Sequence, residues 1–383
     1  MLREDLYIMK DNRRDFIKKG ASLAAALSFG GTAASAANSE AYKQGIKNAK
    51  RQSALVRDAG MQFCESYFFG MNPQKIALTK QMDVLGAVAG IHAAHAGANA
   101  KPWELDTIKA NVKAWENVGL KLRVIEGPPS LGEKTKLGLA GRDEEIANFI
   151  TFMKNLSKAG IDTICYNWMP VIGWYRTSND KPGRGGALVT AFDYEDIKNA
   201  PLTKYGQVSK DLLWKNLEYF LKAVVPEAEK AGIKLAMHPD DPQVDSLRGI
   251  SRIMTTVPNF DRMLKLYPSP NNGITMCQGN FSLMGVDIPD TIHHFGKEKI
   301  HFVHFRNVKG GKFKFEETFH DEGQIDMYKA MEAYYKIGFT GAIRPDHVPT
   351  MAGDSNENPG YSTIAVLYAI GYMRGLMEAV SRA

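Results

Sequence analysis

The chain has 383 residues, 44% hydrophobic and 23% charged, a balance typical of globular proteins that excludes a wholly disordered chain or a coiled coil. Lysine and arginine number 48 and aspartate and glutamate 42, giving a net charge of +6 that is too small and too scattered to indicate a nucleic-acid partner. Three cysteines cannot form a disulfide scaffold.

The N-terminal residues are typical of an export signal. Arg13-Arg14 precede an apolar run of small residues over 20–33, and Ala-Ser-Ala at 34–36 fits a cleavage site. The paired arginines resemble a twin-arginine signal, although the basic region of another secretory signal fits as well. We therefore expect a signal peptide over 1–36, a mature domain over 37–383 and a periplasmic protein. No later run is apolar and long enough to predict a stable membrane association.

Eight short apolar runs alternate with helical stretches through the rest of the chain. Most are rich in β-branched and aromatic residues, as expected for buried parallel strands. Amphipathic stretches lie between them, most clearly over 103–118, 144–159 and 213–231. The apolar runs are 61–69, 84–92, 120–126, 161–167, 233–238, 273–277, 300–305 and 339–346.

This eightfold strand–helix alternation predicts a single-domain α/β fold, a (β/α)8 TIM barrel. The alternative is a doubly wound open sheet, but no Gly-x-Gly-x-x-Gly motif follows an early strand to support it. The long glycine-containing connection over 172–209 predicts a surface insertion or a lid over the barrel mouth.

Metal-type side chains stand at the ends of four successive apolar runs: His238, Cys277, His304 and Asp346. In a TIM barrel the carboxyl ends of the strands form the active-site face, so we expect these residues to converge. Each alone would fit a packing role, but two imidazoles, a thiolate and a carboxylate together suit a divalent transition ion. By ligand softness the set fits Zn²⁺ as well as Mn²⁺.

Other polar side chains follow the same strand ends. His347 directly follows Asp346, and Tyr361 follows a loop rich in Gly, Asn and Pro, so both are acid/base candidates. Arg306 and Arg344 could each bind a substrate carboxylate through two guanidinium hydrogen bonds. Asp240 and Asp241 could bind substrate or hold a metal ligand in place, or could simply cap the next helix. The residues predicted to bind substrate are Asn167, His95, Asp240, Asp241, Arg306 and Arg344.

Several longer motifs together resemble one family. They cover most of residues 84–378 and are 165–177 (Cys-Tyr-Asn-Trp-Met-Pro-Val-Ile-Gly-Trp-Tyr-Arg-Thr), 237–242 (Met-His-Pro-Asp-Asp-Pro), 276–279 (Met-Cys-Gln-Gly), 304–307 (His-Phe-Arg-Asn), 315–320 (Phe-Glu-Glu-Thr-Phe-His), 326–328 (Asp-Met-Tyr), 344–347 (Arg-Pro-Asp-His) and 358–362 (Asn-Pro-Gly-Tyr-Ser). With these motifs the chain resembles the mannonate dehydratase family. The resemblance implies a TIM barrel, usually a homo-oligomer, that binds Mn²⁺, with Fe²⁺, Co²⁺ and Zn²⁺ as alternatives.

The resemblance also implies roles for named residues. It implies His238, Cys277, His304 and Asp346 as metal ligands and His347 and Tyr361 as catalytic residues. The implied reaction removes the C2 proton of a sugar acid and expels the C3 hydroxyl, converting D-mannonate to 2-keto-3-deoxy-D-gluconate. One of the two catalytic side chains would act as base and the other as acid, and Arg306 would bind the substrate carboxylate.

Two other functions remain open. One is a xylose-isomerase-like sugar isomerase or epimerase on the same fold, and the other is an exported sugar-acid binding protein without catalysis. The chain also departs from the family pattern: Tyr67-Phe-Phe-Gly70 stands where the family usually has Trp-Tyr-Gly-Pro, His92-Ala-Ala-His95 replaces a His-His pair, and Gly173-Trp174 replaces Asp-Trp. These departures at the rim put the identity of the substrate in doubt. Family members are usually cytoplasmic, so an export signal is unexpected.

Overall fold

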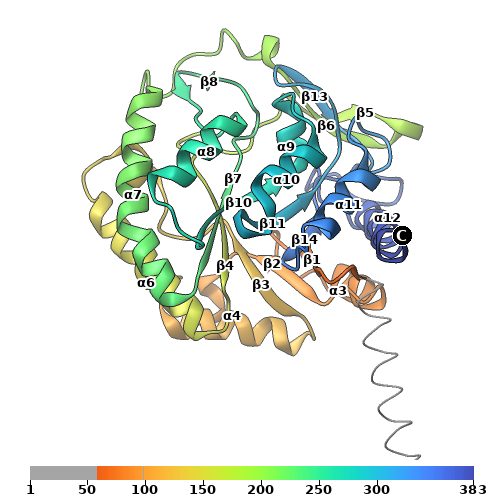
Figure 1. The fold of residues 1–383 in the computed structure, drawn as a ribbon, viewed down its shortest axis with the longest axis horizontal. Helices are drawn as coiled ribbons and strands as arrows, with labels where there is room; N and C mark the ends of the chain where they lie inside the picture. The colour runs from red at the N-terminus through yellow and green to blue at the C-terminus, as the bar shows by residue number, and fades with distance from the viewer. Residues whose placement is uncertain (1–57, 98) are drawn as a thin grey trace, which may run out of the picture. The chain divides into compact units, whose positions relative to one another are not determined.

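The structure is a computed structural model that describes residues 58–97 and 99–383. These residues surround a closed barrel of eight parallel strands (Figure 1). In hydrogen-bonded order the strands are β1 (Gln62–Ser66), β14 (Ala342–Pro345), β11 (Ile300–Phe305), β10 (Asn272–Cys277), β7 (Lys234–His238), β4 (Thr163–Asn167), β3 (Lys121–Glu126) and β2 (Gly86–Ala89). The predicted signal peptide over 1–36 and the boundary at residue 37 lie outside the described residues.

The TIM barrel predicted from the sequence is confirmed. Each of the eight apolar runs supplies one barrel strand, and every neighbouring pair is parallel. Every residue of β10 and β11 is buried, because one face of each strand lines the barrel interior and the other packs under helices. Burial on both faces explains why these strands read as continuous apolar runs.

Helices cover the outside of the barrel (Figure 1). The longest, Lys210–Ala231, continues through Pro226 and ends at Gly232, whose φ of +66° is the left-handed conformation that glycine adopts readily. The helices are α3 (Pro73–Gln81), α4 (Leu105–Asn117), α5 (Glu133–Leu137), α6 (Arg142–Lys158), α7 (Lys210–Ala231), α8 (Val257–Leu266), α9 (Gln278–Leu283), α10 (Ile288–Lys299), α11 (Met327–Lys336) and α12 (Thr363–Arg382), with short 3-10 turns η1 (Ala93–His95), η2 (Arg184–Gly186) and η3 (Tyr194–Asp196).

Small and apolar side chains fill the barrel interior. One buried cluster takes a single residue from each of seven barrel strands: Cys64, Val88, Val124, Cys165, Ala236, Phe302 and Ala342. The interior is therefore a packed core rather than a pore. The polar side chains of the site lie at the carboxyl ends of the strands, beyond this layer.

The connection predicted as a surface insertion or lid contains an ordered hairpin. Its strands β5 (Ser178–Pro182) and β6 (Leu188–Asp193) join β13 (Lys314–Glu317) and β12 (Val308–Gly311) in a four-stranded sheet. Phe192 of β6 and Phe315 of β13 lie opposite each other and pack in a small apolar cluster. A further short pair, β8 (Ser246–Leu247) and β9 (Ile250–Ser251), follows β7.

One described helix, α12, is long and apolar enough to cross a bilayer by length and composition alone. The sequence pattern predicted no apolar run of this length after the N-terminal segment. Its buried side chains, among them Ala369, Ile370 and Met373, belong to the hydrophobic core around the barrel. A core helix of this kind passes the same test of length and composition.

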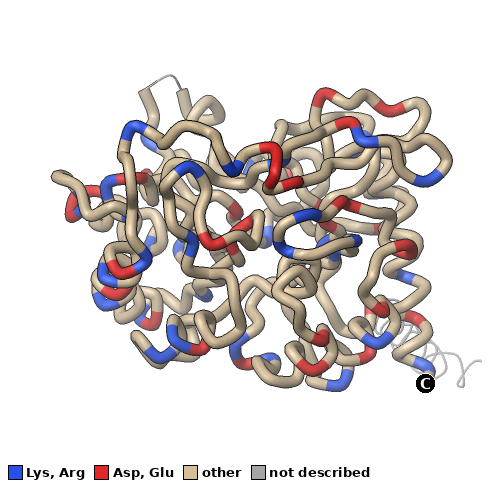
Figure 2. Tube along the Cα trace, turned by 90° about the horizontal axis from the view of Figure 1, so that it is seen from above, with Lys and Arg blue, Asp and Glu red and all other residues tan. Residues whose placement is uncertain are grey.

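Acidic and basic residues are interspersed along the described part of the chain (Figure 2).

Candidate active site

A cavity of about 150 Å³ opens where the barrel strands end. Glu126, Asn167 and His238 line it from the last positions of β3, β4 and β7, and Asp346 lines it one residue beyond β14. Because the barrel is closed and parallel, side chains from distant parts of the sequence meet at this single face.

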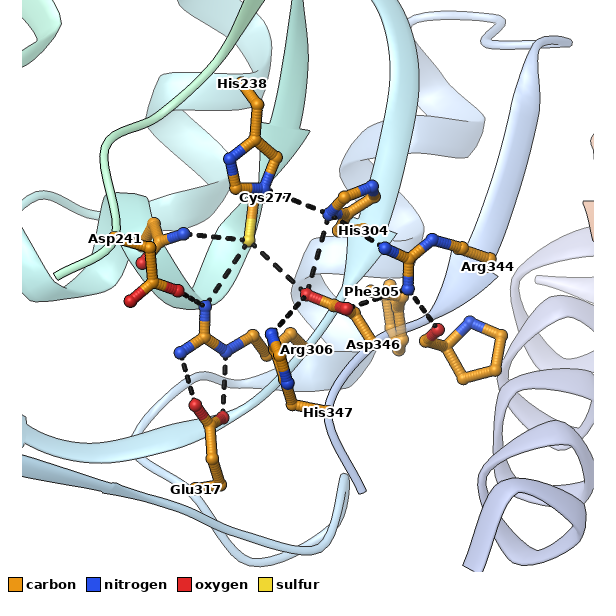
Figure 3. A network of polar contacts seen from close by, with 12 residues as sticks. His238, Asp241, Cys277, His304, Phe305, Arg306, Glu317, Arg344, Asp346 and His347 are labelled. Atoms are coloured by element: carbon orange, nitrogen blue, oxygen red, sulfur yellow. Dashed lines mark hydrogen bonds and ion pairs between the residues drawn. The ribbon is translucent and has the colours of Figure 1, made fainter. Parts of the chain in front are cut away.

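Three predicted metal ligands come together beside this cavity. His238, Cys277 and His304 lie on the neighbouring strands β7, β10 and β11, and their ligand atoms all lie within 4.8 Å of one another (Figure 3). Nε2 of His238 is 3.2 Å from Nδ1 of His304. The parallel register places Cys277 directly beside His304, which explains why strand ends far apart in sequence form one cluster.

Asp346, the fourth predicted ligand, contacts two members of this cluster. Its Oδ2 lies 3.5 Å from Nδ1 of His304 and 3.7 Å from Sγ of Cys277. Its Oδ1 accepts a hydrogen bond of 2.7 Å from Nη1 of Arg344. Burial alone would raise the pKa of Asp346, but the adjacent Arg344 charge holds it well below its usual range. The carboxylate is therefore ionised beside the two imidazoles.

Cys277 is poised as a thiolate. Burial alone would raise its pKa, but hydrogen bonding to His238 and His304 and the charge of Arg306 lower it to about 6. Nδ2 of Asn280, in the helix that begins directly after the strand, lies 3.3 Å from the sulfur. A thiolate with two imidazoles and a carboxylate is a donor set for a divalent transition ion.

Glu126 is a site residue that the sequence reasoning missed. Its Oε2 lies 3.3 Å from Nε2 of His304, and both of its oxygens lie within 3.2 Å of Nη2 of Arg344. Glu126, Cys165 and His304 form a second group of possible ligand atoms within 4.8 Å of one another. Glu126 ends the third predicted strand, so the rule that singled out the other ligands would also have found it.

The two acid/base candidates face each other in the cavity. The rings of His347 and Tyr361 have centroids 5.2 Å apart, and His347 stacks on Trp174 at 5.5 Å with the planes only 10° apart. His347 has a φ of +42°, a left-handed backbone that is rare and costly for a residue other than glycine and is found most often at functional sites. Burial lowers the pKa of His347 to about 4 and raises that of Tyr361.

Three of the residues predicted to bind substrate line this cavity: Asn167, Asp241 and Arg344. Oδ1 of Asn167 accepts hydrogen bonds of 3.0 Å from Nζ of Lys136 and from the Met169 amide. This fixes the amide orientation and leaves Nδ2 of Asn167 as the donor that faces away from these partners. Lys136 is a second residue that sequence reasoning missed.

The other three lie away from the cavity lining formed by the described residues. Arg306 is enclosed by Glu317 and Asp241, which take its guanidinium hydrogen bonds (Figure 3). Asp240 is buried and accepts hydrogen bonds from the backbone amides of residues 253 and 254. His95 lies exposed in η1. Their contact with a substrate stays a prediction to which this geometry gives no support.

The family model for D-mannonate dehydratase (UxuA) matches residues 61–203 and 196–383. The chain belongs to this family. Membership makes it a lyase of the dehydratase class, and the resemblance drawn from the motifs is confirmed at the level of the family.

Individual relatives agree with this membership. Mannonate dehydratase 2 of Halalkalibacterium halodurans is 36% identical over 84% of this chain and 100% of its own length. Mannonate dehydratase of Streptococcus uberis is 38% identical over 73% of this chain and 88% of its own length. The crystal structure of mannonate dehydratase from Streptococcus suis serotype 2 superimposes with a TM-score of 0.75 at 32% identity, covering 84% of this chain and 94% of that one.

The periplasmic location predicted from the N-terminal residues is wrong. The chain belongs to a family of cytoplasmic enzymes of hexuronate breakdown. The segment on which the prediction depended lies outside the residues that match the family model and outside the described residues.

Proposed function

We propose that this chain dehydrates D-mannonate to 2-keto-3-deoxy-D-gluconate with the aid of a divalent ion. One observation carries the proposal. A cluster of two imidazoles, a thiolate and a carboxylate lies beside the same cavity into which His347 and Tyr361 project. Family membership supplies the reaction class, and this arrangement supplies a place for each group that the reaction needs.

The donor set fits a resident divalent ion. His238, Cys277, His304 and Asp346 would hold it, and Nε2 of His304 lies 3.3 Å from Oε2 of Glu126, whereas Nδ1 of the same ring faces His238. A carboxylate behind a ligating imidazole fixes the orientation of the ring. When bound, the ion would supply positive charge that offsets the charge developing as a proton leaves the carbon beside a carboxylate. We propose Mn²⁺, with Fe²⁺, Co²⁺ and Zn²⁺ as alternatives.

His347 would serve as the base and Tyr361 as the acid. The ring of His347 lines the cavity, and burial lowers its pKa to about 4, so the neutral ring can accept the C2 proton on a ring nitrogen. Stacking on Trp174 holds the ring in one orientation. A tyrosine hydroxyl is protonated at neutral pH and can donate to the departing C3 hydroxyl.

Other side chains would orient the substrate. Nδ2 of Asn167 can donate to a substrate oxygen, because its Oδ1 is already engaged by Lys136. Arg344 lines the cavity and Arg306 does not, which makes Arg344 the better of the two candidates for a substrate carboxylate. The homo-oligomer that the resemblance implies stays a prediction, which light scattering of the purified protein would test.

The experiment is a keto-acid assay with Mn²⁺-loaded protein and a panel of aldonic acids that includes D-mannonate. We expect turnover of D-mannonate and a fall in kcat of about 10²–10⁴-fold in His347→Gln and in Tyr361→Phe. Tyr335→Phe is the matched control, because Tyr335 lies on α11 with 42% of its surface exposed.

Two outcomes would contradict the proposal. Interconversion of neutral sugars without keto-acid formation would favour the isomerase or epimerase alternative. Binding of the acids without turnover of any of them would favour a binding protein.

A further inference from the structure

A second, larger cavity of about 330 Å³ adjoins the candidate active site, and Tyr361 lines both. Its walls come from residues 66–78, which begin at the last residue of β1, and 353–364, which follow β14. These two strands are neighbours in the barrel, and their carboxyl ends open on the same face as the metal-type cluster. A molecule that reacts beside Tyr361 could therefore extend into the second cavity.

The lining of this cavity combines aromatic rings with uncharged hydrogen-bonding groups. Phe68 and Phe69 place their rings 5.4 and 5.7 Å from that of Tyr361, and Phe69 is 62% exposed. Gln74, Ser355 and Asn358 line the same space. Aromatic faces that pack on C–H groups, together with a few polar groups that bind hydroxyls, suit a sugar ring. Tyr67-Phe-Phe-Gly70 is also one of the stretches in which this chain departs from the family pattern.

The charges around the cavity favour a neutral occupant. Lys75 contributes to the wall, but its Nζ lies 2.7 Å from Oε1 of Glu65 and donates to the Ser66 carbonyl oxygen at 2.9 Å. This positive charge is therefore balanced within the protein. Asp354 and Glu357 also line the cavity and would repel an anion.

The sizes of the two cavities also indicate that one substrate occupies both of them. The cavity beside the metal-type cluster, at about 150 Å³, is smaller than the range of roughly 300–1,000 Å³ typical of small-molecule sites. The adjoining cavity brings the combined space into that range.

We propose that the second cavity binds a neutral sugar unit carried on the C4 oxygen of the aldonic acid, so that the substrates include glycosylated aldonic acids. This inference rests on the proposed dehydratase function. The acid end would lie beside the metal-type cluster and the added sugar beyond Tyr361, against Phe69.

The test compares D-mannonate with 4-O-mannosyl-mannonate, the acid obtained by oxidising mannobiose, as substrates of the Mn²⁺-loaded protein. Gln74→Trp fills the second cavity from the exposed start of α3, and Phe69→Ala removes the exposed ring. The readout is the ratio of kcat/KM for the disaccharide acid to that for mannonate. Phe313→Ala, at a 50% exposed ring in the turn between β12 and β13, is the matched control.

We expect turnover of both acids by the unaltered protein and a fall in the ratio of at least fivefold in Gln74→Trp and in Phe69→Ala, but not in Phe313→Ala. Turnover of mannonate without turnover of the disaccharide acid, or a smaller fall in both variants, would overturn this inference and leave the proposed function standing. If the protein dehydrated neither acid, this inference and the proposed function would both be overturned.

Discussion

Nε2 of His304 lies 3.3 Å from Oε2 of Glu126, on the side of the ring opposite to Nδ1, which faces His238 and Asp346. A carboxylate in this position orients a ligating imidazole and increases its basicity. Glu126→Gln keeps the shape but removes the charge, so we expect metal affinity to fall about 10- to 100-fold. Titration of the metal-free protein with Mn²⁺ in competition with a chelator would measure it.

The matched control is Glu144→Gln, at an exposed position in the first turn of α6. Its metal affinity should equal that of the unaltered protein. Equal affinity in Glu126→Gln as well would mean that the carboxylate serves only to pair with Arg344.

Cys277→Ser tests the thiolate ligand. A hydroxyl is a far weaker ligand than a thiolate for a transition ion, and it would not ionise beside His238 and His304. We expect metal to be lost during gel filtration, with elemental analysis giving less than a tenth of the content of the unaltered protein. Circular dichroism would show whether the variant keeps its fold.

Cys64→Ala is the control for removing a buried sulfur. Cys64 lies in the packed interior of the barrel, and burial raises the pKa of its thiol to about 12. This variant should keep its metal, although it creates a small cavity. Full metal content in Cys277→Ser would refute the assignment of the sulfur as a ligand.

The sequence located the barrel and most of the site for a simple reason. A closed parallel barrel brings every strand end to one face, so a polar residue after an apolar run has a predictable place, as His238 and Cys277 illustrate. The side chains that enclose Arg306 could not be predicted in this way. Glu317 reaches it from β13, and the strand pairing that positions Glu317 depends on β6, more than 100 residues earlier in the chain. Nothing local in the sequence specifies that pairing.

Breaking the buried network of ion pairs around Arg306 should also lower the free energy of unfolding. Arg176 and Arg306 are both buried and share the carboxylates of Asp241 and Glu317. Arg176→Met leaves the two carboxylates with a single buried guanidinium, so we expect a loss of about 3–5 kcal/mol in the free energy of unfolding. Urea unfolding followed by fluorescence would measure the loss.

Arg184→Met is the comparison on the surface. Arg184 pairs with Asp321, but its side chain is 41% exposed, and exposed pairs contribute about 0–1 kcal/mol. A loss of the same size in both variants would mean that burial does not decide the strength of the network.

Stability should also depend on pH through His320. Burial lowers the pKa of His320 to about 4, and its Nε2 lies 2.7 Å from the carbonyl oxygen of Phe305, as in a hydrogen bond donated by a neutral ring. In the unfolded chain the histidine pKa is about 6.5, so the unfolded state binds the proton more readily. The contribution to stability is therefore complete above about pH 6.5 and is lost as the pH falls toward 4.

Between pH 7.5 and pH 5 this difference amounts to about 2 kcal/mol in the free energy of unfolding. His320→Gln removes the titrating group but keeps a donor for the carbonyl of Phe305, so its stability should fall by about 2 kcal/mol less over the same interval in urea unfolding. His294→Gln, at a half-exposed histidine paired with Asp261, should follow the unaltered protein. If His320→Gln also followed the unaltered protein, the imidazole of His320 would have to be protonated in the folded protein at pH 5, which would contradict its lowered pKa.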